Sequence, residues 1–207
     1  MNIQRFRLPL VAILRGLSPE EAPACGAALF AAGFRLLEVP LNRPGAIAAI
    51  RALVAIAPPD AVVGGGTMLT RAHVEAVFEA GGRLFVSPNC NPDVISYARS
   101  LGMLCAPGVA TPTEAFAALD AGADALKLFP AETIGVAGLK AIKTVLPPDT
   151  PLWPVGGVTP GSLKAWIDAG ASGAGIGSQL YAPGVTAVQL RQRAEAFAAA
   201  WQQETRA

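Results

Sequence analysis

The sequence has few of the residues that build metal sites and disulfides. It contains one histidine, His73, and three cysteines, Cys25, Cys90 and Cys105, among 207 residues. None of them stands in a CxxC pair or in the spacing of zinc ligands, so we expect no metal site and no cofactor. An odd number of unclustered cysteines is also typical of a reducing compartment, which predicts a cytoplasmic location.

Charged residues and long apolar runs are scarce as well. Only 15% of the residues are Asp, Glu, Lys or Arg, and the net charge is +1. This balance offers no basic surface for nucleic acid or for an anionic membrane. No uninterrupted apolar stretch reaches the roughly 20 residues of a transmembrane helix, and residues 1–5 lack the pattern of a signal peptide. We therefore expect neither nucleic acid nor membrane as a partner.

The sequence is instead rich in apolar residues, at 52%, and in a repeated phrase. Five times an alanine-rich stretch of helical pattern ends in glycine, and an apolar run follows within a few residues. Glycine after a helix accepts the left-handed conformation that closes the last turn. The phrase therefore predicts a helix, a glycine cap and a strand, with caps at Gly33, Gly81, Gly102, Gly122 and Gly170.

Two intervals of 48 residues between these glycines each hold one further unit, with a Pro-Pro-Asp joint at 58–60 or 147–149. The apolar run LVAILRG near the start completes a set of eight strand–helix units. The predicted strands are 10–15, 36–41, 62–67, 84–88, 103–107, 125–129, 152–156 and 173–177. The predicted helices are 18–32, 44–57, 70–81, 91–101, 112–121, 136–146, 160–169 and 185–204.

Eight such units without a linker predict the α/β class and one domain, residues 1–207, folded as a single (β/α)₈ TIM barrel. The alternative is an open, doubly wound sheet. The even repetition and the lack of a GxGxxG fingerprint after the first strand disfavour that alternative.

A lysine stands inside one apolar run, at Lys127 in the stretch 125–130 (ALKLFP). Desolvating an ammonium group is costly, so lysine is rarely buried without a partner. Lys127 is then either a structural lysine that pairs with a carboxylate or reaches solvent, or an amine of lowered pKa that forms a Schiff base with a carbonyl group. For a lone lysine the structural interpretation is favoured.

Glu38 shifts this balance toward chemistry. The glycine caps and the Pro-Pro-Asp joints recur at an offset of 89 residues, and Glu38 and Lys127 share that offset. The two residues then occupy equivalent positions on opposite strands of the predicted barrel and point inward in one layer. We expect the carboxylate and the amine to meet. A purely structural ion pair is the weaker interpretation, because buried pairs seldom improve on apolar packing.

Arg15 is the third charged residue within a predicted strand, and all three lie toward the carboxyl ends of their strands, where barrel enzymes build active sites. Glycine also follows the last two strands: Gly156 and Gly157 after the seventh, and Gly177 with Ser178 after the eighth. Loops at these places commonly bind phosphate through bare backbone amides. The glycines alternatively make only tight turns, but their presence in both loops favours a phosphate site.

Three further residues complete the expected site. Thr67 follows a run of three glycines and offers a hydroxyl near the centre, whereas Pro88 and Phe129 either wall a small pocket or pack in the core. A buried amine, an opposed carboxylate, a cationic anchor and a phosphate site suit an aldolase that works through a Schiff base. The iminium is then the electron sink for breaking a carbon–carbon bond, and the carboxylate moves the protons.

The chain resembles the 2-keto-3-deoxy-6-phospho-sugar-acid aldolases over nearly its whole length. The motifs that carry the resemblance are, in order, LVAILRG, LEVPLN, GGGTML, VSPN, LKLFPAE, GGVTP and GIGSQLY. The resemblance implies a class I aldolase, a homotrimer of (β/α)₈ barrels, with Lys127 as the Schiff-base lysine and Glu38 as general acid and base. It also implies that Arg15 and Thr67 contact the keto acid, while the loop glycines and Ser178 hold the phosphate.

One position separates the subfamilies. Gluconate-type enzymes usually carry arginine four residues after the catalytic glutamate, but here that residue is Asn42, as in the galactonate-type enzymes. Arg15 or Arg43 would compensate for the missing arginine, and we place Asn42, Pro88 and Phe129 among the keto-acid contacts. The implied reaction is cleavage of 2-dehydro-3-deoxy-6-phosphogalactonate to pyruvate and D-glyceraldehyde 3-phosphate, with the gluconate epimer as the alternative substrate.

Two functions of other classes stay open. An isomerase or synthase acting on a phosphorylated sugar would share the phosphate site but would need no lysine on a strand. A non-catalytic binder would hold a phosphorylated metabolite without releasing pyruvate.

Overall fold

The computed structural model describes Ile3 and residues 6–205. The expectation about a signal peptide concerned residues 1–5, most of which lie outside the described residues. The described chain alternates between strands and helices, as the repeated phrase predicts.

Nine strands are formed among the described residues: β1 (Leu10–Ile13), β2 (Leu36–Pro40), β3 (Val62–Gly66), β4 (Leu84–Val86), β5 (Leu104–Ala106), β6 (Gly108–Val109), β7 (Leu126–Leu128), β8 (Leu152–Pro154) and β9 (Ala174–Ile176). Eight α-helices accompany them in the same part of the chain: α1 (Ala22–Ala31), α2 (Ala46–Ile56), α3 (Arg71–Glu79), α4 (Pro92–Ser100), α5 (Pro112–Asp120), α6 (Ala131–Lys143), α7 (Leu163–Asp168) and α8 (Ala187–Thr205). A short 3₁₀ helix, η2 (Pro160–Ser162), precedes α7.

Side-chain caps start several of these helices. Thr70 accepts a hydrogen bond from the amide of His73, and Thr111 forms a reciprocal capping box with Glu114. Thr159 forms a similar box at the start of η2. Such caps satisfy amides that have no partner within the helix. Thr70, Thr111 and Thr159 thus stand at the starts of α3, α5 and η2.

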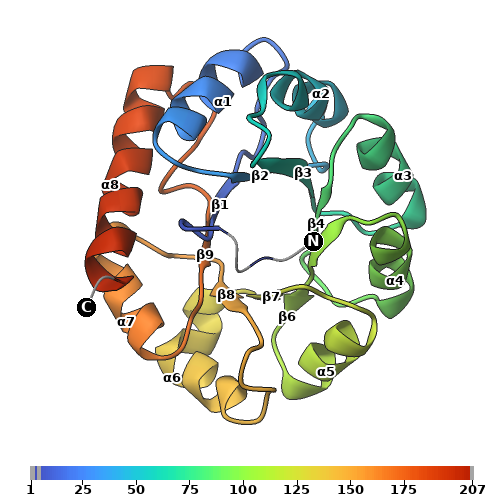
Figure 1. Ribbon diagram of the computed structural model, residues 1–207, viewed down its shortest axis with the longest axis vertical. Helices are drawn as coiled ribbons and strands as arrows, with labels where there is room; N and C mark the ends of the chain where they lie inside the picture. The colour runs from blue at the N-terminus through green and yellow to red at the C-terminus, as the bar shows by residue number, and fades with distance from the viewer. Residues whose placement is uncertain (1–2, 4–5, 206–207) are drawn as a thin grey trace.

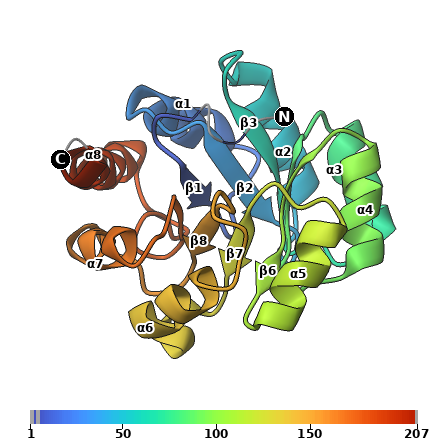
Figure 2. The same cartoon turned by 60° about the horizontal axis from the view of Figure 1, so that its bottom comes forward.

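The helices surround the strands, and Figures 1 and 2 show this arrangement from two directions. Two apolar layers result. Residues on one face of the strands, such as Leu36 and Trp153, form an inner cluster, whereas residues on the other face, such as Leu37 and Leu126, pack against the helices. This alternation of side chains is the period of two expected for β-strands. It turns Glu38, two residues after Leu36, toward the interior.

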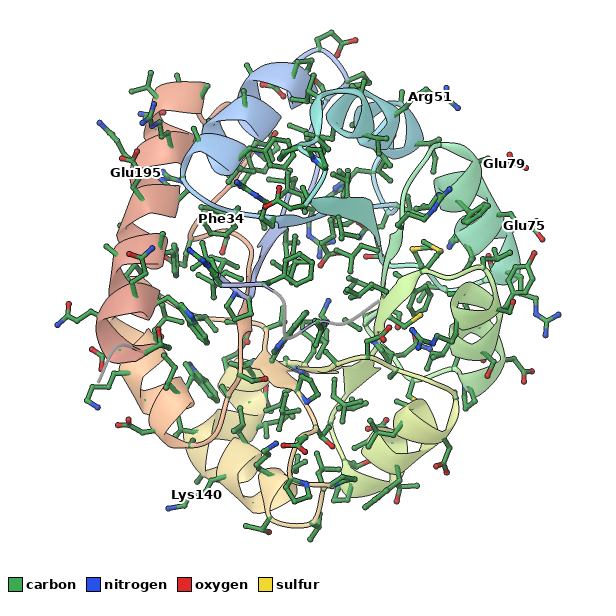
Figure 3. All side chains as sticks on the ribbon, viewed as in Figure 1. Phe34, Arg51, Glu75, Glu79, Lys140 and Glu195 are labelled. Atoms are coloured by element: carbon green, nitrogen blue, oxygen red, sulfur yellow. The ribbon has the colours of Figure 1, made fainter. Side chains whose placement is uncertain are left out.

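Charged side chains on the helices point away from both apolar layers. Arg51, Glu79 and Lys140 project outward in Figure 3, whereas the side chain of Phe34 is fully buried. Among the described residues, no helix combines the length and the apolar character required to cross a bilayer.

The prediction of a single closed (β/α)₈ barrel is wrong. The strands form two sheets: a six-stranded parallel sheet of order β5-β4-β3-β2-β1-β9 and a three-stranded one of order β6-β7-β8. The predicted fifth strand, 103–107, ends at Pro107, which has no N–H to donate, and the pairing partner changes there. β5 lies within the predicted strand and pairs with β4, whereas β6 follows its predicted end and pairs with β7. On the other side of the small sheet, a single bridge, Val155–Gly175, stands in place of a ladder.

The start of the sixth helix is also wrong in the prediction. Helix α6 begins at Ala131, directly after Pro130, instead of at residue 136. Gly135 interrupts it with φ 73°, so the segment is two helical pieces joined at a kink. The sequence pattern detected only the second piece, because glycine within a helix weakens the helical pattern.

Candidate active site

Glu38 and Lys127 meet in the interior. They come from β2 and β7, which lie on opposite sides of the central region (Figure 1), and Lys127 Nζ is 3.9 Å from Glu38 Oε1. The exposed fractions of the two side chains are 10% for Lys127 and 2% for Glu38. Lys127 faces inward because its neighbours Leu126 and Leu128 both pack in the outer layer. The expected contact between carboxylate and amine is therefore present.

Burial dominates the electrostatics of this pair. Desolvation raises the pKa of Glu38, although the cations Lys127 and Arg15 oppose the shift. Desolvation also lowers the pKa of Lys127; the charge of Glu38 opposes this shift and that of Arg15 adds to it. Both shifts favour the neutral forms of the two groups. A neutral amine beside a carboxyl group is the state in which lysine attacks a carbonyl carbon.

Glu38 depends on a neighbouring glycine for its position. A Cβ atom on Gly66, at the end of β3, would overlap with Oε2 of Glu38. The next residue, Thr67, has φ 54°, a left-handed conformation that is unusual for a β-branched side chain. The run of glycines before Thr67 therefore provides the space in which the carboxylate lies, and Thr67 follows at a strained turn of the backbone.

Arg15 lies at the rim, beyond the end of β1. Its Nη1 donates a hydrogen bond of 2.9 Å to Oδ1 of Asn42, and both residues are exposed. Its charge nevertheless influences the pKa of both Glu38 and Lys127, so the guanidinium lies close to the buried pair. The structure thus brings Asn42 to Arg15. Among the described residues, Arg15 is the exposed residue whose charge shifts the pKa of both Glu38 and Lys127.

Phe129 lies near the amine, and Pro88 lies near the strand that pairs with β7. Lys127 Nζ is 5.1 Å from the centre of the Phe129 ring. Pro88 approaches the backbone of Gly108 so closely that a Cβ there would overlap with it, and Gly108 is the neighbour of Lys127 in the ladder between β6 and β7. Phe129 therefore lies beside the amine, whereas Pro88 contacts the backbone of the neighbouring strand β6.

A cavity of about 340 Å³ opens next to the buried pair. Its lining includes six residues that the sequence singled out: Arg15, Phe129, Gly156, Gly157, Gly177 and Ser178. Gly156 and Gly157 have φ 117° and 66°, values that side-chain-bearing residues rarely adopt. Bare backbone at this position is open to an anion. Lys127 and Glu38 are not part of the lining, and Phe129 connects them to the cavity.

The cavity also contains residues that the sequence reasoning missed, foremost Glu132, Gln179 and Tyr181. The predicted sixth helix began at residue 136, so Glu132 had no place on the carboxyl side of its strand. Its position five residues after Lys127 was the available indication. Tyr181 is buried, and its hydroxyl donates a hydrogen bond of 3.5 Å to Glu21.

The residues form two adjoining parts. The inner part holds an amine and a carboxyl group in a nearly dry environment, and the outer part is a polar cavity with a glycine turn and a guanidinium. Such an arrangement suits a ligand with a reactive carbonyl at one end and an anion at the other. Among the described residues, no group of three or more His, Cys, Asp or Glu gathers as metal ligands do.

Comparisons with known proteins agree on one family. The family model "KDPG and KHG aldolase" matches residues 3–195. A protein of Rhizobium meliloti (strain 1021), named probable 2-dehydro-3-deoxy-6-phosphogalactonate aldolase, is 48% identical over 193 residues, 93% of this chain and 91% of the relative. The 2-dehydro-3-deoxy-6-phosphogalactonate aldolase of Escherichia coli (strain K12) is 47% identical over 197 residues, 95% of this chain and 96% of the relative.

Solved structures give the same result. A structure described as native KDPGal has a TM-score of 0.96 and 45% identity, with full coverage of both chains (100% each). KDPG aldolase from Legionella pneumophila, with pyruvate captured at low pH as a covalent carbinolamine intermediate, has a TM-score of 0.79 and 27% identity, and the match covers 96% of this chain and 94% of that one.

Proposed function

Because the chain belongs to the KDPG and KHG aldolase family, we propose that it is a class I aldolase. Its substrate in this proposal is 2-dehydro-3-deoxy-6-phospho-D-galactonate, and its products are pyruvate and D-glyceraldehyde 3-phosphate. The observation that carries the proposal is the buried Lys127–Glu38 pair, 3.9 Å apart, beside an open, glycine-lined cavity. A buried amine whose pKa is lowered by desolvation is what Schiff-base chemistry requires, whereas neither an isomerase nor a binder requires it.

The first half of the mechanism forms the electron sink. Neutral Lys127 attacks the C2 ketone and gives a carbinolamine, and Glu38 donates a proton to the departing hydroxyl so that water leaves and an iminium forms. The raised pKa of Glu38 favours the protonated carboxyl group that makes this donation. The lowered pKa of Lys127 favours the unprotonated amine that makes the attack.

The second half breaks the carbon–carbon bond. Glu38, now a carboxylate, removes the proton of the C4 hydroxyl directly or through a water, the C3–C4 electron pair moves into the iminium, and glyceraldehyde 3-phosphate leaves. The proton on Glu38 then returns to C3 of the enamine. Hydrolysis of the resulting iminium releases pyruvate and restores the amine.

The remaining residues are assigned to binding. Arg15 holds the keto-acid carboxylate, with Asn42, Thr67, Pro88 and Phe129 around it. The amides of Gly156, Gly157 and Gly177 and the hydroxyl of Ser178 hold the phosphate.

We further propose one aldolase domain that acts as a homotrimer in the cytoplasm. Sedimentation velocity of the purified protein tests the trimer, and a monomeric mass at micromolar concentration would refute it.

Borohydride trapping tests the Schiff base. Incubation with pyruvate and borohydride should give one reduced pyruvate adduct, and peptide mapping should place it on Lys127. Lys127→Ala should abolish the adduct, whereas Lys140→Ala, which removes an exposed lysine of α6, should keep it. An adduct on another lysine, or none, contradicts the mechanism.

Specificity at C4 needs a second measurement. Pyruvate release from the galactonate and gluconate epimers, coupled to lactate dehydrogenase, should favour the galactonate epimer in kcat/KM. A preference for the gluconate epimer overturns the substrate but leaves the aldolase chemistry intact. The same assay separates an aldolase from an isomerase or from a non-catalytic binder, which release no pyruvate.

A further inference from the structure

Glu132 places a carboxylate inside the open cavity. It is the second residue of α6 and lines the cavity together with Arg15, Phe129 and the glycine turn. A Cβ on Gly156 would overlap with Oε2 of Glu132, and one on Gly157 would lie 3.5 Å from its Cβ. The glycine turn therefore leaves room for this carboxylate as well as for an anion. Gly156 is restricted to glycine for two reasons, its φ of 117° and the position of Glu132.

The carboxylate has no structural partner. Among the described residues, Glu132 makes no hydrogen bond and no ion pair, although Arg15 lines the same cavity. Glu114, which also lies in the first turn of its helix, differs in this respect, because its carboxylate accepts hydrogen bonds from the amides of Ala110 and Thr111. A favourable interaction with the helix dipole requires only a place in the first turn. It does not explain why the side chain of Glu132 lies over the glycine turn.

An ionised carboxylate only accepts hydrogen bonds, and it repels a phosphate. Next to a phosphate site it weakens binding unless the ligand offers it a donor. In the proposed substrate, the part between the reactive carbonyl and the phosphate carries two hydroxyls. The C4 hydroxyl lies at the bond that breaks and belongs to Glu38. The C5 hydroxyl, next to the phosphate-bearing carbon, is the donor that remains.

We propose that Glu132 binds the substrate by accepting a hydrogen bond from its C5 hydroxyl, which is the C2 hydroxyl of glyceraldehyde 3-phosphate. The inference rests on the proposed function and deepens it. Glu132 then selects for phosphorylated hydroxyaldehydes over phosphorylated aldehydes that lack this hydroxyl. Glu132 takes no part in forming the Schiff base at C2, a step that pyruvate undergoes without any aldehyde present.

The experiment runs the reaction in the direction of synthesis, from pyruvate and an aldehyde. Two aldehydes are compared, D-glyceraldehyde 3-phosphate and 3-phosphonooxypropanal, which differ only in the C2 hydroxyl. The unmodified enzyme should prefer the hydroxyaldehyde in kcat/KM by roughly ten- to a hundredfold, the range for a hydrogen bond to a charged group. Glu132→Ala should reduce this ratio to near one, and Glu132→Gln should retain part of it.

Two controls keep the outcome interpretable. Asp93→Asn removes an exposed carboxylate from the first turn of α4, outside the cavity lining, and should leave the ratio unchanged. Exchange of the pyruvate methyl protons with D₂O requires the Schiff base but no aldehyde, and it should continue at the same rate in Glu132→Ala. If neither the unmodified enzyme nor any variant exchanges the pyruvate methyl protons, the proposed function has failed. If exchange persists and Glu132→Ala changes kcat/KM for both aldehydes by the same factor, the assignment of Glu132 is wrong and the proposed function stands.

Discussion

Glu38 and Lys127 are almost without contact with water, whereas Gly157, Ser178 and Glu132 are exposed, although Glu132 follows Lys127 by only five residues. The buried pair uses the low polarity of its surroundings to bring both groups toward their neutral forms. The open cavity instead presents backbone amides and charged side chains that are in contact with solvent. In the proposed mechanism, chemistry and recognition therefore occupy neighbouring regions with opposite exposure.

This difference predicts that substitutions in the two regions will affect different kinetic parameters. Changes to the buried pair should lower kcat with little effect on KM, because they act on groups used in the transition state. Changes in the cavity should raise KM, because they remove contacts that exist before and during the reaction.

The largest effect is expected at Glu38. Glu38→Gln preserves the shape of the side chain but removes its ability to exchange a proton, so kcat should fall by roughly 10²- to 10⁴-fold. KM should stay within a few-fold of the original value. Steady-state cleavage assays measure both parameters. A variant that loses only substrate affinity would show that Glu38 is a binding group.

Lys127→Met should reveal the pH dependence of a buried carboxyl group. Without the amine, the pKa of Glu38 rises further, because the opposing charge of Lys127 is lost. A folded-state pKa above the unfolded value stabilises the protein below the unfolded pKa, and this stabilisation disappears as the pH rises through the folded pKa. The variant should therefore be less stable than the original at pH 8, by roughly 3 kcal/mol, and much closer to it at pH 5.

Urea unfolding at the two pH values measures this difference. The double variant Lys127→Met/Glu38→Gln provides the matched control, because it has no carboxylate left to bury and should lose the pH dependence. A constant deficit of Lys127→Met at both pH values would contradict the explanation.

Gly66→Ala tests whether the position of the buried carboxylate depends on the glycine run. The added Cβ would overlap with Glu38 Oε2 and displace it. A shift of about 1 Å in a catalytic group reduces kcat by roughly 10²-fold. Gly161→Ala is the control, since nothing lies within 4 Å of a Cβ there. Equal activity of the two variants would show that the carboxylate relaxes without penalty.

The smallest effect is expected at the exposed rim. Asn42→Ala removes the hydrogen bond partner of Arg15, which then samples other rotamers. One exposed hydrogen bond contributes roughly 1 kcal/mol, so KM for the keto acid should rise about fivefold while kcat changes little. Asn42→Asp should restore the partner and lower KM again. A fall in kcat without a change in KM would place Asn42 at the chemical step instead.

Sequence reasoning located the buried pair but not its whole surroundings. The shared offset of 89 residues was sufficient to bring Glu38 and Lys127 together, because corresponding strands take corresponding places in a repeated architecture. It was not sufficient to find Glu132. The predicted strand ended at residue 129 and the next predicted helix began at residue 136, whereas in the structure α6 begins at Ala131, directly after Pro130.

The closed barrel failed for a related reason. Repetition along the chain predicts how many units exist and in which order, and both agree with the described helices. It does not predict which backbone groups pair between neighbouring strands. Pro107 offers no N–H, and the pairing changes partner there, so a local feature decided the sheet topology.

The sequence by itself determined the alternation of strands and helices, the inward direction of Glu38 and Lys127, and the glycine turn of the cavity. These follow from short-range periodicity and from residues with special backbone preferences. Only the tertiary structure decided the 3.9 Å contact of the pair, the hydrogen bond between Arg15 and Asn42, and the position of Glu132 over Gly156. Such contacts depend on how distant segments pack against each other, which no local pattern records.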